Sequence, residues 1–183
     1  ASTYHIMEGT LFWSGNKDEN NVYSAQIRVS GGELLVNNNF ILRGNILFDI
    51  AGLTITDDVP AGEKQKIENA LRGAGYFNAA KYPVMEYTIE GALPSSIPAF
   101  NTVLEGSLKI KDKTNVLNIP ATLDCKEDVC RLETLTFDLG YNGWGLTMPG
   151  QKAKPASGKA AAGAPPVSDV IRLVLKCTAR KKN

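Results

Sequence analysis

The stretch Ile171-Arg172-Leu173-Val174-Leu175-Lys176-Cys177-Thr178-Ala179 places an apolar or small side chain at every second position. Successive side chains of a β-strand point to opposite faces. One face of this segment therefore carries Ile171, Leu173, Leu175, Cys177 and Ala179, and the other carries Arg172, Lys176 and Thr178. A strand with one dry and one wet face is typical of an antiparallel sheet that covers a core on one side.

The same alternation recurs along the chain and predicts an all-β fold. We expect strands near residues 4–14, 22–30, 33–37, 40–51, 84–91, 103–111, 115–124, 129–139 and 167–179. We predict hairpin turns at Gly31-Gly32 and Asn37-Asn38-Asn39, because Gly and Asn accept positive φ at low cost. Lys111–Thr114 is a third predicted short turn. About eight one-sided strands joined by short turns favour a sandwich or a closed up-and-down barrel.

Two segments depart from the alternation. Residues 63–72 carry Ile67, Ala70 and Leu71 on one helical stripe, between Pro60 and Gly73, and predict a short helix beside the barrel. Residues 149–166 are rich in Ala, Gly, Pro and Lys and lack bulky apolar residues. We interpret them as a mobile low-complexity loop within a single domain spanning 1–183, because such a segment cannot offset its ordering entropy by burial.

Charge and hydropathy argue against two classes of partner. The chain has 20 Lys and Arg against 19 Asp and Glu, so no basic footprint for nucleic acid is expected. No apolar run approaches the roughly 18 residues that span a bilayer, so no stable membrane insertion is expected. The first residues, Ala1-Ser2-Thr3, would suit either the segment left after cleavage of a signal peptide or a shortened start.

The residues that usually carry catalysis or bind metals are scarce. His5 is the one histidine and stands apart from other chemistry-bearing residues, so we expect a solvated or structural role for it. No nucleophile elbow, phosphate-binding loop or zinc-protease motif occurs. We therefore predict a non-catalytic protein without a cofactor or a metal site.

The three cysteines form a near pair and a single residue. Cys125 and Cys130 flank a predicted hairpin tip, where opposed strand residues come close enough for a disulfide. Two reduced thiols and a redox-active pair are the alternatives. Cys177 lies on the dry face of the last strand and is predicted to be a buried, inert thiol.

The dry faces predict the lining of the barrel. A barrel of about eight strands is either filled by such side chains or just wide enough for one small ligand, and periodicity leaves both open. The predicted interior residues are Leu11, Trp13, Ile27, Ile46, Phe48, Tyr87, Ile89, Leu108, Ile110 and Phe137.

Several segments, in order, resemble the YceI-like family of bacterial lipid-binding proteins. Leu71–Pro83 resembles the family's leucine, aromatic pair and Lys-Tyr-Pro sequence before a strand. Gly106–Ile110 with Ile119-Pro120-Ala121 resembles its long hairpin, and Trp13–Lys17 resembles the end of its first strand. The family's acidic residues around the aromatic pair are replaced by Gly75 and Asn78 here, so head-group recognition is expected to differ.

The resemblance implies a lipocalin-like barrel that binds an isoprenoid or quinone-type lipid, with the predicted interior residues as ligand contacts. It also implies export to the periplasm or secretion. A homodimer is compatible with the sequence. The alternative is a structural or interaction domain whose barrel is filled by side chains and takes no small-molecule ligand.

Overall fold

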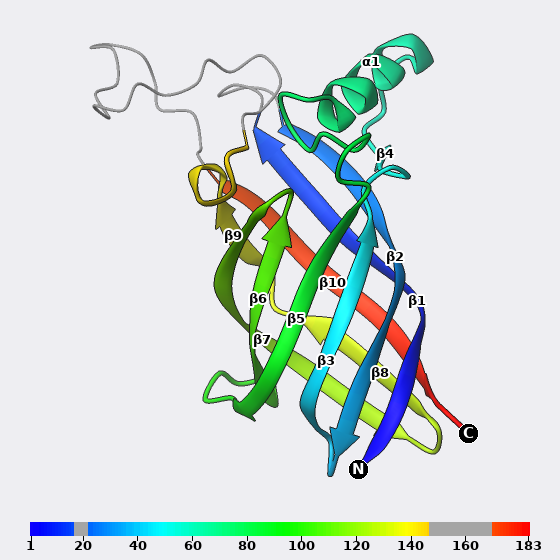
Figure 1. Ribbon diagram of the computed structural model, residues 1–183, viewed down its shortest axis with the longest axis vertical. Helices are drawn as coiled ribbons and strands as arrows, with labels where there is room; N and C mark the ends of the chain where they lie inside the picture. Colours follow the sequence, from blue (N-terminus) through cyan, green and yellow to red (C-terminus); the bar gives the residue numbers. More distant parts are fainter. Residues whose placement is uncertain (17–21, 147–169) are drawn as a thin grey trace.

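A computed structural model describes residues 1–16, 22–146 and 170–183. Eight antiparallel strands close into a barrel in the order β1-β10-β8-β7-β6-β5-β3-β2, and β2 pairs back with β1 (Figure 1). The strands are β1 (Ser2–Asn16), β2 (Val22–Asn37), β3 (Phe40–Asp49), β5 (Val84–Pro94), β6 (Thr102–Ile110), β7 (Lys113–Lys126), β8 (Val129–Thr134) and β10 (Val170–Lys181). The predicted up-and-down barrel with one short helix is confirmed.

Three short elements accompany the barrel strands. β4 (Thr54–Ile55) pairs with β2, and β9 (Phe137–Gly140) pairs with β10. A 3-10 turn, η1 (Tyr141–Trp144), follows β9. β4 and η1 were not expected from the alternation, because each is too short to show a period, whereas most of β9 falls within the predicted strand over 129–139.

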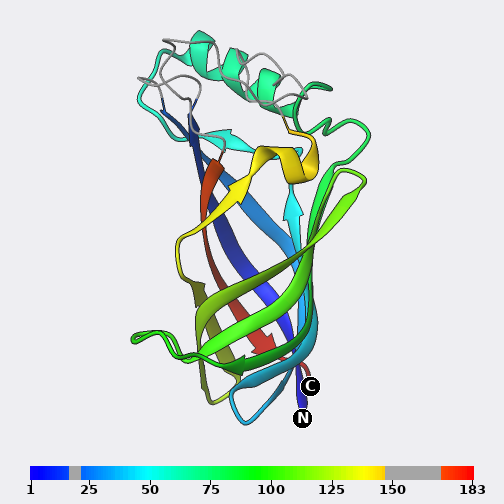
Figure 2. The same cartoon turned by 90° about the vertical axis from the view of Figure 1, so that its left-hand side faces the viewer.

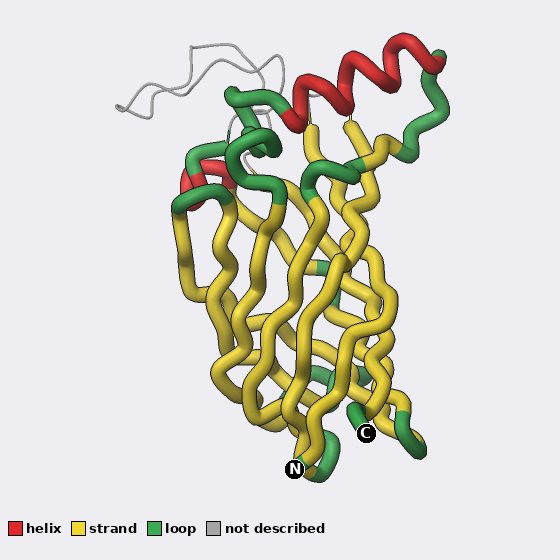
Figure 3. The backbone as a smooth tube through the Cα atoms, turned by 45° about the vertical axis from the view of Figure 1, so that its right-hand side comes forward, coloured by secondary structure: helices red, strands yellow, loops and turns green. Residues whose placement is uncertain are grey.

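Helix α1 (Ala61–Arg72) lies across one end of the barrel, and both chain termini lie at the other end (Figures 2 and 3). The helix buries Ile67 and Leu71. Arg72 ties it down by donating a hydrogen bond of 2.6 Å to the Leu53 carbonyl and by pairing with Glu68 at 3.1 Å. The segment after α1 adds the buried rings of Tyr76 and Phe77 to this end.

Two predicted turns are confirmed. Asn38 and Asn39 have φ values of 50° and 64° and join β2 to β3. Lys111, with φ of 59°, begins the two-residue turn between β6 and β7.

The predicted turn at Gly31-Gly32 is wrong. β2 runs through both glycines as one strand of 16 residues, and its pairing with β3 shifts register between Val29 and Gly31. Gly32 has φ of +135°, and a Cβ there would collide with the carbonyl oxygen of Asn45. The glycines therefore permit a β-bulge that bends a long strand, and the chain does not reverse here.

The predicted strand over 129–139 is two strands. β8 ends at Thr134 and β9 begins at Phe137, and the Leu135 amide instead donates to the Pro120 carbonyl at 2.8 Å. The predicted loop at 149–166 and the first residues of the expected last strand, 167–169, lie outside the described residues.

We expect Gly32→Ala to destabilise the protein by about 1–3 kcal/mol or more, because the left-handed φ and the close approach of Asn45 both oppose a Cβ. The matched control is Gly31→Ala, whose added methyl would meet only Leu47 at 3.9 Å. It should change stability by less than about 0.5 kcal/mol. Urea unfolding of wild type and both variants tests this prediction. Equal unfolding midpoints for the two variants would show that position 32 does not require glycine.

Candidate functional site in the barrel interior

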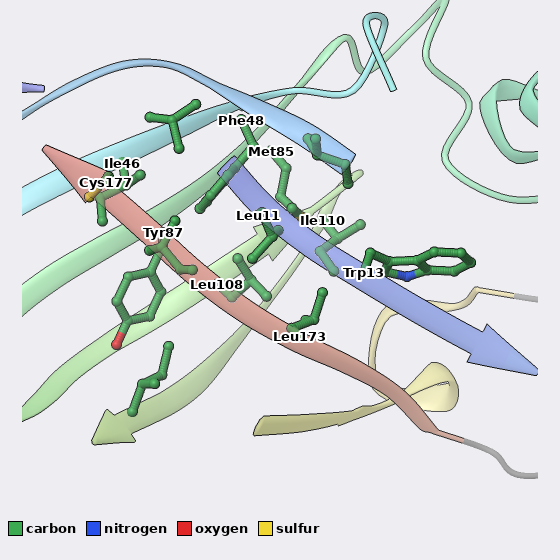
Figure 4. Packing of buried hydrophobic residues seen from close by; sticks show 14 of the residues in the cluster. Leu11, Trp13, Ile46, Phe48, Met85, Tyr87, Leu108, Ile110, Leu173 and Cys177 are labelled. Atoms are coloured by element: carbon green, nitrogen blue, oxygen red, sulfur yellow. The ribbon is translucent and has the colours of Figure 1, made fainter. Parts of the chain in front are cut away.

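The structure gathers the predicted interior residues into one apolar cluster (Figure 4). All of them except Phe137 are buried, and Phe137 is partly buried and packs against the cluster. Strand register explains the gathering, because Ile46 faces Tyr87 on the next strand and Tyr87 faces Leu108 on the one after. On the other wall, Leu11 stands opposite both Ile27 and Leu175.

A cavity of about 20 Å³ remains among these side chains. Five predicted residues line it, namely Leu11, Phe48, Tyr87, Leu108 and Phe137. Sequence reasoning did not select the other four, Leu117, Ile119, Leu173 and Leu175. Leu173 and Leu175 lie on the dry face of the alternating stretch, so the signal for them was present. The cavity could hold about one water molecule by volume, but its apolar lining gives a water no partners.

The interior lacks charge. Among the described residues, the only buried polar or charged residues are Thr102 and Thr134. Thr134 Oγ1 accepts a hydrogen bond of 2.9 Å from the Leu175 amide, and Thr102 Oγ1 donates to the Leu93 carbonyl at 3.3 Å. This lining can hold a hydrocarbon by apolar contact.

Tyr87 brings one hydroxyl into the interior. Its Oη donates a hydrogen bond of 2.7 Å to the Leu117 carbonyl. Burial raises the pKa of Tyr87 well above its usual range, so the phenol stays neutral at physiological pH. Tyr87 is thereby fixed as part of the wall rather than as a titrating group.

A groove of about 620 Å³ lies on the outer surface, across β1 and β10, where β1 shifts register between Ile6 and Glu8. Its lining includes the ion pair of Lys176 and Glu133, at 3.6 Å, and the exposed side chain of Met7. Phe12, which points out of the barrel, has the Lys176 ammonium 6.0 Å from its ring centre. The sequence analysis did not predict this groove, which lies beside the register shift of β1.

In the structure Cys125 and Cys130 form a disulfide across the β7–β8 hairpin, with their Cα atoms 4.0 Å apart. Cys177 is a free, buried cysteine. Burial raises the pKa of the Cys177 thiol to about 12. The thiol is therefore neutral at physiological pH, and the thiolate that would react is scarce.

His5 and Glu33 form a pair at the protein surface. His5 Nδ1 lies 3.3 Å from a carboxylate oxygen of Glu33, and both side chains are exposed. Within residues 1–16, 22–146 and 170–183, no group of three or more His, Cys, Asp or Glu side chains could hold a metal ion. In the same ranges no helix combines the length and the apolar character that a membrane crossing requires.

Comparison with known proteins agrees with this architecture. Residues 11–179 match the YceI-like domain. Among curated proteins there is no match. BcnA of Burkholderia cenocepacia is 12% identical, with a TM-score of 0.68 over 93% of this chain and 95% of its own.

Two other solved structures are similar. A polyisoprenoid binding domain from Saccharophagus degradans, implicated in plant cell wall breakdown, is 9% identical with a TM-score of 0.65 over 100% of both chains. The YCEI protein of Campylobacter jejuni is 15% identical with a TM-score of 0.57, over 85% of this chain and 84% of its own. At these identities the likenesses show the fold alone.

Thiol titration should find one reactive thiol per chain in unfolded, unreduced protein and almost none in native protein at pH 8. The sign follows from the raised pKa, because a thiol that titrates near pH 12 is neutral at pH 8. Cys177→Ser should abolish the reaction in denaturant. Three reactive thiols in unreduced denatured protein would show that Cys125 and Cys130 are reduced.

Proposed function

Because this chain belongs to the YceI-like family, we propose that it binds an elongated apolar molecule, an isoprenoid or quinone-type lipid, inside the barrel and performs no catalysis. The observation that carries the proposal is the continuous apolar cluster inside a closed barrel, which contains no charged side chain among the described residues. The polyisoprenoid binding domain from Saccharophagus degradans, which is similar in fold, supports the ligand class.

Burial of hydrocarbon supplies the affinity. Each CH₂ removed from water contributes about 0.8 kcal/mol. A chain of several isoprene units therefore gains enough free energy to bind without polar contacts. The closed ladder from β1 round to β2 satisfies the backbone hydrogen bonds of the wall, so a hydrocarbon inside meets side chains only.

The interior must open before such a ligand enters. Drug-sized ligands occupy pockets of about 300–1,000 Å³, whereas the cavity here is about 20 Å³. The lining is mostly leucine and isoleucine, whose side chains can change rotamer when an apolar chain replaces their contacts. The phenolic hydrogen bond of Tyr87 to Leu117 fixes one part of the wall while the others move.

The small cavity favours a second candidate function. A barrel filled by its own side chains, acting as a structural or interaction domain, would show an interior like this one. The two functions differ in one measurable respect, which is whether lipid enters the barrel.

The proposal extends to the compartment. An oxidising compartment permits the bond between Cys125 and Cys130. We propose that the protein resides in the periplasm or outside the cell. Fractionation of the native host, with an antibody against the protein, tests this.

Native mass spectrometry of the protein incubated with an octaprenyl quinone should show a 1:1 complex. Leu117→Phe places a bulkier ring on the cavity lining and should weaken binding at least tenfold. The matched control, Val116→Phe, changes the neighbouring side chain, which is 77% exposed on the outside, and should bind like wild type. Thermal unfolding confirms that both variants fold.

Two outcomes would contradict the proposal. Wild-type protein that gains no lipid at saturating quinone would favour the filled barrel. Equal binding by wild type and both variants would place the lipid outside the interior, for instance in the outer groove.

A further inference from the structure

One buried indole in the barrel has no hydrogen-bond partner among the described residues. Trp13 is 2% exposed, and its Nε1 makes no hydrogen bond to any of them. The other tryptophan is satisfied, because Trp144 Nε1 donates to the Leu108 carbonyl at 3.0 Å. A buried donor without an acceptor costs about 1–3 kcal/mol, and such groups are rare in native proteins.

Trp13 lies at the end of the barrel that α1 covers. Its ring meets Tyr76 edge-on at a centroid distance of 6.1 Å, and Tyr76 in turn packs edge-on against Phe77 at 4.6 Å. These aromatic rings follow α1 in the chain and hold the indole from the helix side. On the barrel side, Trp13 shares the inward face of β1 with Leu11 (Figure 4).

The indole also borders the cavity lining. Leu173, on β10, is the direct strand partner of Trp13 and lines the cavity together with Leu11. A lipid chain that occupies the space between Leu11 and Leu173 therefore has one end beside Trp13.

We propose that Trp13 Nε1 donates a hydrogen bond to an oxygen at the polar end of the bound lipid. The ligand class is thereby narrowed to apolar chains that carry a terminal acceptor, such as a quinone carbonyl or a prenol hydroxyl. The polar end lies at the α1 end of the barrel, and the hydrocarbon runs past Leu11 toward the end that holds the Asn38-Asn39 turn. This inference rests on the proposed function.

The test compares two probes that differ by one oxygen atom: octaprenol, and the same hydrocarbon with hydrogen in place of the hydroxyl. Wild-type protein should bind octaprenol about five- to tenfold more tightly, which is the effect of one net hydrogen bond. Trp13→Phe keeps an aromatic ring and removes the N–H. It should lower the preference to about one while changing hydrocarbon affinity less than threefold.

Trp144→Phe is the matched control, because its N–H already bonds to Leu108 in the wall. It should retain the preference for octaprenol. In ¹⁵N-labelled wild type, octaprenol should move the Trp13 indole N–H resonance downfield more than the hydrocarbon does. This second measurement needs no variant and keeps the proposal testable if Trp13→Phe is unstable.

The outcomes separate the two proposals. If neither probe binds, the proposed function fails and this inference fails with it. If both probes bind wild type equally and shift the indole resonance equally, lipid binding stands and the role of Trp13 is wrong. A preference that survives in Trp13→Phe also overturns the role of Trp13, since another donor would then carry it.

Discussion

The double pairing of β1 is the constraint on which the rest of the structure depends. β1 hydrogen-bonds to β10 on one side and to β2 on the other, and these two ladders close the sheet. Closure removes every free edge of the barrel and fixes the phase of each strand. Because side chains alternate, a slip of one residue would turn Phe12 inward and Leu11 outward. The apolar interior and the place of Trp13 both follow from this register.

Much of the fold could be predicted from the sequence, since alternation alone reveals one-sided strands. The wrong prediction of a turn at Gly31-Gly32 shows the limit of prediction from the local sequence pattern. Two glycines permit a turn or a bulge equally well, because both use positive φ. What decides between them is the carbonyl of Asn45 on β3, 13 residues further along the chain from Gly32, which leaves no space for a Cβ. A contact with a residue on another strand cannot be inferred from the sequence pattern around the two glycines.

The candidate site was predictable in composition but not in volume. Period-2 alternation identifies which side chains face inward, and Ile46, Tyr87 and Leu108 duly meet across three strands. The space left between them depends on strand tilt, rotamers and the few residues that vary in size. The outer groove was not predicted, although the register shift between Ile6 and Glu8 has a trace in the sequence. The buried apolar residues of β1 change from the even positions of Tyr4 and Ile6 to the odd positions of Leu11 and Trp13.

A filled interior changes how an apolar lipid would be selected. Opening the space between Leu11 and Leu173 has a fixed cost, because the same side chains must move for any ligand. The gain grows with length, by about 0.8 kcal/mol for each buried CH₂. For short apolar molecules the free energy of burial is therefore smaller than the cost of opening the interior. For long chains it exceeds that cost after several methylene groups. The barrel would discriminate by chain length without a single specific contact, and a donor such as Trp13 Nε1 would only need to set which end of the chain lies beneath the helix.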